Sequence, residues 1–345
     1  QGVSSAASDV YKRQLNKHMD NYEFAKYVTT KENVRETIER YGVAIIPDVL
    51  DEDECDQMVS GMWDYFEHIT QAWEVPIKRD QPDTWRQIYN LFPMHSMLFQ
   101  YFNVGHCQAS WDVRQNPNVI DVFSHIWQCS DEKLLVSFDG LSFNLMPEVT
   151  KRGWNRDNTW YHSDQSFTRN RFECIQSWVT GLDVNEGDAT LAVMEGSNRY
   201  HEEFATTFQV KDKADWYKLT REQQAFYEER GCTYKKIKCP KGSMVLWDSR
   251  TIHCGVEAMK TRATPKLRAV IYVCYTPRSF ATKAIIRKRI KAFEELRTST
   301  HWPHKFTLFG KNPQTYGKPL PEITRIAPPT INMMGRYLIG YEEVE

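Results

Sequence analysis

The sequence predicts a mainly β protein, a sandwich or barrel with flanking α-helices. Between residues 134 and 275, short β-rich runs follow one another with turn residues between them. Apolar residues at helical spacing occur before and after this region. Hydrophobic residues make up 41% of the chain and aromatic residues 13%, which provides the apolar area for a large core.

The first third of the chain is predicted to be helical, with one strand. Apolar residues at helical spacing over 31–41 end at Gly42, and a β-rich run occupies 43–47. Acidic residues at 51–54 suit the first turn of an amphipathic helix. The stretch 76–115 is expected to be irregular, and a further helix is expected at 118–129.

The central part is predicted to be β. The expected strands are 134–138, 141–146, 159–162, 174–184, 190–194, 234–239, 244–247 and 267–275. One helix should interrupt them, because Thr220 and Gln223 form a capping-box pattern. After Pro277, Ile286 and Ile290 mark the apolar face of another helix, and the Pro-rich tail should lie over the body.

One large domain is expected for a chain of 345 residues. Residues 1–18 are interpreted as a non-native or disordered leader, because Met19 is a more ordinary start. Residues 19–345 would then form a single domain. Its parts are a helical N-terminal support (31–130), a β core (133–277), and a basic helix with a C-terminal tail (278–345).

Charge and cysteine content favour a cytoplasmic protein. The 44 Lys and Arg nearly equal the 45 Asp and Glu, so no overall field favours nucleic acid or a membrane. Residues 278–305 are an exception, with eight Lys and Arg against two Glu. No apolar run reaches the ~18 residues of a membrane span. The eight cysteines form no CxxC pair and are expected to be reduced.

His162, Asp164 and His253 are the candidate metal ligands. His162 and Asp164 lie two positions apart, so at the end of a strand both side chains face the same way. Alone, this pair is as well explained by a surface ion pair or a capping Asp. His253 ends a turn-strand segment, and two His with one carboxylate suit a non-haem Fe(II) oxygenase better than zinc. Cys254 should point the opposite way, into the packing.

Arg268 is the candidate partner of a carboxylate cosubstrate. It lies within the apolar strand 267–275, where a guanidinium is costly without a partner. A dicarboxylate could accept a bidentate pair from it. An internal salt bridge is the plainer explanation, and Arg262 or Lys266 could bind the carboxylate instead.

Several blocks in order resemble the phytanoyl-CoA dioxygenase-like family of 2-oxoglutarate oxygenases, which also contains the ectoine hydroxylases. Residues 41–50 (YGVAIIPDVL) are similar to its opening strand and helix, and 160–164 (WYHSD) to its W-H-x-D block. Residues 191–201 (LAVMEGSNRYH) and 242–253 (GSMVLWDSRTIH) look like its later blocks. The resemblance covers roughly 36–280. Glu195 replaces a Pro of the family pattern, and 257–265 look like an insertion.

The resemblance implies a double-stranded β-helix, the jelly-roll or cupin-like barrel. It implies Fe(II), 2-oxoglutarate and O2 as cofactors and cosubstrates, with release of succinate and CO2. The metal-binding and catalytic residues would be His162, Asp164 and His253. The cosubstrate residues would be Arg268, Asn144 and Trp178. Asp164 argues against the halogenating branch, which has a small residue there.

The substrate candidates surround the metal pair in sequence. Trp154 and Arg156 precede it, Phe167 and Arg169 follow it, and Trp85 lies in a long loop that could be a lid. Together they would form a basic, aromatic mouth for a small polar or anionic metabolite. Solvated loop charges are an equal alternative.

Other functions remain open at this stage. The basic helix could serve a nucleic acid or protein substrate, although such helices are usually solvated faces. The fold could also be a non-catalytic binding module, or a cupin-type hydrolase or isomerase. His301 and His304 could suggest a second metal but are expected to be ordinary surface residues. The sequence makes no prediction of oligomeric state.

Overall fold

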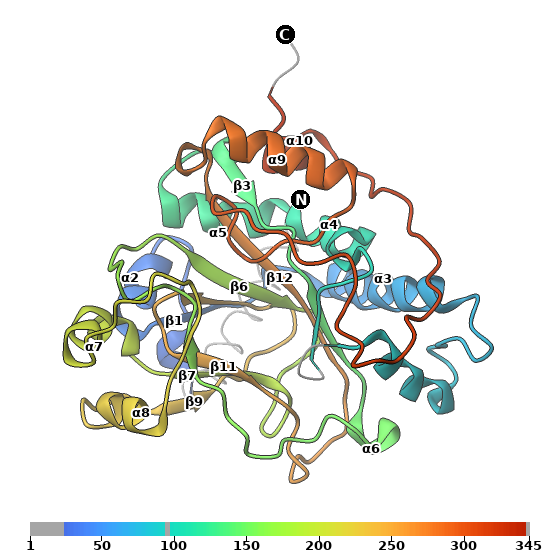
Figure 1. The fold of residues 1–345 in the computed structure, drawn as a ribbon, viewed down its shortest axis with the longest axis horizontal. Helices are drawn as coiled ribbons and strands as arrows, with labels where there is room; N and C mark the ends of the chain where they lie inside the picture. The colour runs from blue at the N-terminus through green and yellow to red at the C-terminus, as the bar shows by residue number, and fades with distance from the viewer. Residues whose placement is uncertain (1–23, 94–96, 343–345) are drawn as a thin grey trace, which may run out of the picture.

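Two antiparallel sheets form the centre of the computed structural model, which describes residues 24–93 and 97–342 (Figure 1). The larger sheet has the order β1 (Val43–Ile46), β10 (Met244–Asp248), β6 (Ile175–Thr180), β12 (Arg268–Pro277), β4 (Leu141–Asn144) and β2 (Leu98–Phe99), with β3 (Leu134–Val136) also paired to β12. The smaller sheet has the order β8 (Tyr217–Lys218), β5 (His162–Ser163), β11 (His253–Val256), β7 (Thr190–Met194) and β9 (Tyr234–Lys236). The predicted jelly-roll core is confirmed.

Successive side chains along each strand point to opposite sides, so each sheet has an inner and an outer face. On β10, Val245 and Trp247 join the cluster inside the barrel, and Met244 and Leu246 join the cluster under the helices. On β7 of the smaller sheet, Val193 faces inward with the same inner cluster. The space between the sheets therefore receives every second side chain of each strand.

Helices cover the outer faces of both sheets (Figure 1). The larger sheet carries α2 (Val34–Tyr41), α3 (Glu52–Thr70), α4 (Gln108–Arg114) and α5 (Pro117–Trp127). Beside the smaller sheet lie α7 (His201–Thr207) and α8 (Arg221–Glu228). The remaining short helices are α6 (Pro147–Thr150) and the 3-10 helices η1 (Ala25–Tyr27), η2 (Pro82–Leu91), η3 (Val104–His106), η4 (Asp131–Lys133), η5 (Ser197–Tyr200) and η6 (Arg278–Phe280).

Local sequence signals fix several helix ends as predicted. Gly42 ends α2 in the left-handed region, with φ of 78°. The side chain of Asp51 accepts from the amide of Glu54 and completes a capping box at α3. Thr220 does the same for α8. The prediction of an irregular 76–115 is wrong in part, because η2 and α4 form there and bury their apolar faces.

The C-terminal part returns over the body in three pieces. Helix α9 (Lys283–Glu294) is followed by a hairpin over 299–308, which we call the tail hairpin, and later by α10 (Met333–Ile339). Between these last two, the chain runs along the end of α3, where the amide of Thr324 donates to the carbonyl of Ile69 (Figure 1).

Arg289 of α9 ties these pieces together from a fully buried position. Its guanidinium donates to the carbonyls of Pro303, Val136, Leu338 and Ile339 at 2.6 to 3.1 Å. Burial lowers the pKa of Arg289 to about 9. This cation of the basic segment 278–305 therefore holds parts of the fold together from the inside.

Within the described residues, no helix is both long and apolar enough to cross a membrane. The predicted leader, residues 1–18, lies outside the described part of the chain.

Candidate metal and cosubstrate site

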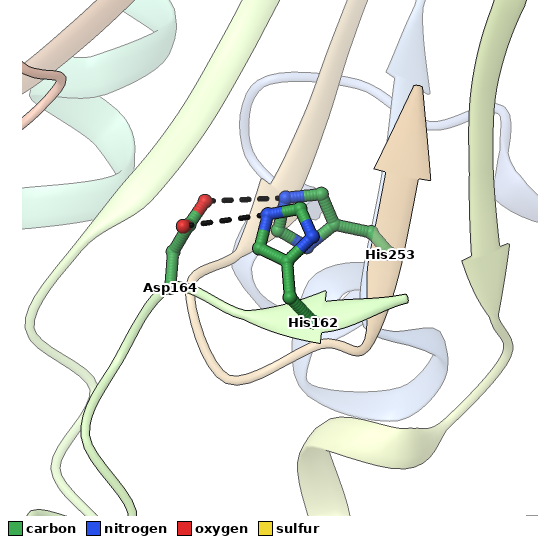
Figure 2. Close-up of side chains that lie close together, drawn as sticks. All are labelled: His162, Asp164 and His253. Carbon is green, nitrogen blue, oxygen red and sulfur yellow. Dashed lines mark ion pairs between the residues drawn. The ribbon is translucent and has the colours of Figure 1, made fainter. Parts of the chain in front are cut away.

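The three predicted metal ligands meet at one point inside the barrel. His162 on β5 and His253 on β11 are direct register partners, so their side chains lie on the same face of the smaller sheet. Asp164 follows β5 immediately. Its Oδ1 lies 3.4 Å from Nε2 of His162 and its Oδ2 lies 3.2 Å from Nε2 of His253 (Figure 2). All three side chains are buried, and the candidate ligand atoms lie within 4.8 Å of one another.

Backbone carbonyls orient both imidazole rings. Nδ1 of His162 lies 3.1 Å from the carbonyl oxygen of Trp160, and Nδ1 of His253 lies 2.8 Å from that of Thr251. Because a carbonyl oxygen only accepts, Nδ1 carries the proton in each ring and Nε2 keeps its lone pair, which in His253 accepts from Nε1 of Trp247 at 3.3 Å. Both lone pairs face Asp164, which is the arrangement that a metal requires of its ligands.

The charge states also suit a divalent cation. Burial alone would raise the pKa of Asp164, but the neighbouring His162 and His301 hold that pKa well below its usual range. Burial and the neighbouring His162 lower the pKa of His253. One carboxylate and two imidazoles that leave other positions open match the donor set of non-haem Fe(II).

Two further side chains support the ligands. Gln176 on β6 donates from Nε2 to Oδ2 of Asp164 at 2.8 Å, which fixes the carboxylate from the larger sheet. The ring of Trp160 stacks on that of His162 with centroids 4.7 Å apart. Such contacts hold ligands in place before the metal arrives.

Substituting Gln176 by Leu is expected to weaken Fe(II) binding about 10- to 100-fold, because the Asp164 carboxylate loses the amide that orients it. Anaerobic titration with Fe(II) measures the change. The exposed Gln57→Leu on α3 serves as control and should bind iron like the native protein. Equal affinity in both variants would contradict a supporting role for Gln176.

The three predicted cosubstrate residues also lie together, on the inner face of the larger sheet. Arg268 on β12 is the register partner of Asn144 on β4. The guanidinium of Arg268 lies 5.1 Å from the ring centroid of Trp178 on β6. Nη1 of Arg268 donates to the carbonyl of Ala189 at 2.8 Å, whereas its Nε is buried and has no partner among the described residues.

Unpaired buried donors mark this inner face as a site for an acceptor. Within the described part of the chain, Nε1 of Trp178 also has no partner, and neither does the hydroxyl of Ser142, two residues before Asn144 on β4. Leaving such groups unpaired costs about 1 to 3 kcal/mol each. A bound carboxylate would satisfy them, so the residues fit the distal end of 2-oxoglutarate.

Arg262, one of the two alternatives to Arg268, is less suited to bind the carboxylate of a cosubstrate. A pocket lined by Arg268 and Asn144 also contains Arg262 and Lys266. Arg262, however, makes ion pairs with Glu148 at 2.6 Å and with Asp188 at 3.2 Å. Arg268 has no carboxylate partner among residues 24–93 and 97–342. The internal salt bridge considered for Arg268 is therefore absent from the described part of the chain.

Comparison with known proteins gives a family. Residues 38–259 match the model of the phytanoyl-CoA dioxygenase (PhyH) family. The chain belongs to this family. The match contains all three predicted ligands and ends before Arg268.

The chain is also similar to individual proteins. The chain is 28% identical over 214 residues to Ava biosynthesis cluster protein O of Aspergillus versicolor, a match that covers 60% of this chain and 66% of that protein, just under two thirds. Among solved structures, the hypothetical protein JW0805 from Escherichia coli has a TM-score of 0.55 at 13% identity, covering 97% of this chain and 90% of that one. A putative oxidoreductase from Salmonella typhimurium LT2 has a TM-score of 0.51 at 12% identity, covering 99% and 94%. These two structures share the fold.

Of the predicted substrate residues of this PhyH member, two lie at the rim of the barrel. Trp154 bridges to Ala258, which lines the Arg268 pocket. Arg156 is exposed and close enough to Glu257 to affect its pKa. Arg169 is held by Glu173 at 2.7 Å and by Asp215, in an ion network that also includes Lys305 of the tail hairpin.

The other two predictions need correction. Trp85 is buried in η2, packs on Trp63 of α3 and donates to the carbonyl of Lys78, so it belongs to the helical layer and not to a lid. Phe167 is 3% exposed and stacks between His201 and Phe204, because the chain after Asp164 turns into the core beside α7. Cys254 lies in that same core, as expected.

His301 is the residue that sequence reasoning misplaced. It is partly buried, and all three side chains of the triad lie close enough to affect the pKa of its ring. No sequence pattern indicated this, because its place depends on the fold of a tail about 50 residues beyond His253. His304 is also partly buried and contacts Thr276 and Phe280.

Proposed function

We propose that this PhyH member is an Fe(II)- and 2-oxoglutarate-dependent oxygenase. It oxidises a C–H bond of a small polar or anionic metabolite and releases succinate and CO2. One observation carries the proposal. A buried His162-Asp164-His253 triad lies in the same barrel as Nε of Arg268 and Nε1 of Trp178, two donors that have no acceptor among residues 24–93 and 97–342.

Each residue then has a defined role. Iron and 2-oxoglutarate, when bound, supply the oxidation chemistry. His162, Asp164 and His253 hold the metal, and Arg268 holds the distal carboxylate through charge-assisted hydrogen bonds. Trp178 and Asn144 line the same inner face and orient that end of the cosubstrate. The burial of the triad keeps water from the reacting atoms.

A small substrate is favoured by how enclosed the triad is. His162 and His253 are each 4% exposed, and Asp164 is 7% exposed. Two cations of α9 serve the fold itself, because Arg289 is buried and Lys288 donates to the carbonyl of Phe306. Lys283, Arg287 and Lys291 remain exposed. A groove for nucleic acid or an acidic protein has less support from this arrangement.

The test is succinate formation by the full chain in air with Fe(II) and 2-oxoglutarate, first alone and then with sets of small polar and anionic metabolites. Stimulation by a metabolite, abolished by a chelator, is the expected result. Stimulation by RNA or an acidic protein alone would favour the macromolecular alternative. Native protein that binds neither Fe(II) nor 2-oxoglutarate would be a non-catalytic module.

Substituting Arg268 by Leu is expected to raise the dissociation constant for 2-oxoglutarate roughly 100-fold, since two charge-assisted hydrogen bonds are lost. Anaerobic titration of the Fe(II)-loaded protein gives the value. Lys266→Ala, in the same pocket, should change it by less than about threefold. A larger effect at Lys266 than at Arg268 would assign the carboxylate to the lysine.

A further inference from the structure

The tail hairpin is held firmly against the mouth of the barrel. Its two strands meet at Ser299 and Leu308. Ser299 donates its amide to the carbonyl of Phe138 and accepts from the amide of Phe138, at 2.9 and 3.0 Å. From α9, Arg289 and Lys288 donate to carbonyls of the hairpin. The hairpin is therefore fixed from both sides.

Trp302 places the tip of the hairpin over the strands beside Asp164. Its side chain is 4% exposed and packs with Cys174 and Cys274. Cys274 is the register partner of Gln176, the residue that donates to Asp164. Lys305 adds an ion pair to Glu173 at 2.9 Å. These contacts place Trp302, and with it the neighbouring His301, at the part of the larger sheet where Gln176 donates to Asp164.

The imidazole of His301 has an unused polar atom there. Its Nε2 is buried and has no hydrogen-bond partner among the described residues. Such an atom costs free energy unless something outside the chain pairs with it. His301 does not join the group of three side chains whose ligand atoms converge, so it is placed beside the metal position and not in the ligand set.

We propose that His301 is a positioning residue that hydrogen-bonds through Nε2 to an oxygen atom of a molecule bound at the open side of the metal. The inference rests on the proposed function. That oxygen belongs either to the chelating 2-oxo acid end of the cosubstrate or to the molecule at the remaining metal position. In both cases the hydrogen bond would orient the molecule that carries this oxygen.

Two probes distinguish these sources in the full chain under anaerobic conditions. The first is 2-oxoglutarate, followed by the visible charge-transfer absorption that it gives with Fe(II). The second is nitric oxide, which occupies the remaining position and reports through its electron paramagnetic resonance spectrum. His301→Ala should either weaken 2-oxoglutarate roughly 10- to 100-fold or change the nitric oxide spectrum at unchanged 2-oxoglutarate affinity. His301→Gln, which keeps an N–H donor, should restore the native signal in part.

His304→Ala is the matched control, because His304 lies in the same hairpin but contacts Thr276. It should leave both signals and Fe(II) affinity as in the native protein. Native-like signals in His301→Ala would overturn the inference, and so would a loss of Fe(II) as large as that of a ligand variant. If the native protein itself gives no charge-transfer absorption, the proposed function fails instead.

Discussion

Replacing Asp164 by Ala is expected to weaken Fe(II) binding by more than about 100-fold and to abolish succinate formation. Removing a residue that only supports a ligand costs about 10- to 100-fold, and Asp164 is the single carboxylate of the triad. It also accepts the hydrogen bond from Gln176. Anaerobic Fe(II) titration and succinate measurement check both effects.

The control for this variant is Asp64→Ala on α3, whose carboxylate pairs with Arg79 on the surface. It should keep native iron affinity and activity. Circular dichroism establishes that both variants are folded. Native iron affinity in Asp164→Ala would contradict the assignment of the triad as the metal site. Iron binding that survived loss of both His162 and His253 would contradict it as well.

Replacing Arg289 by Met is expected to lower the free energy of unfolding by about 3 to 5 kcal/mol. Met keeps most of the side-chain volume but leaves the carbonyls of Pro303, Val136, Leu338 and Ile339 without their donor. Denaturant unfolding of the full chain measures the loss.

Arg287→Met is the matched control, because Arg287 is exposed on the same helix. A surface change of this kind is expected to alter the free energy of unfolding by no more than about 0.5 kcal/mol. An equal loss of unfolding free energy in the two variants would mean that the buried hydrogen bonds of Arg289 do not stabilise the fold and that only the lost positive charge matters.

Elements with local signals could be predicted from the sequence. Gly42, the acids at the start of α3 and the capping pattern at Thr220 each determine a helix end through contacts within a few residues. Strand β11 was not predicted, because His253–Val256 contains a Gly and becomes a strand only by pairing with β7 and β5. Helix α10 was missed for a similar reason, since it forms where Arg289 holds its last carbonyls.

The candidate site also has residues that local sequence patterns predict and residues that depend on long-range contacts. His162 and Asp164 share a face because of strand geometry, and Arg268 was recognisable as a charge in an apolar strand. Sequence spacing could not show that Trp85 and Phe167 are core residues and not substrate residues. Both are buried through contacts with residues far away in the sequence. His301 reaches the triad through Trp302 and the tail hairpin, which are long-range contacts without a sequence period.

Strand β12 has a consequence for the synthesis of the protein. It pairs with β6, β4 and β3, all of which leave the ribosome before it. Until residue 277 has emerged, the larger sheet lacks the strand that joins Gln176 and Trp178 to Asn144. Long-range pairing of this kind slows folding. We expect nascent chains to bind iron only after residue 277 has left the ribosome, when β12 can join β6 to β4.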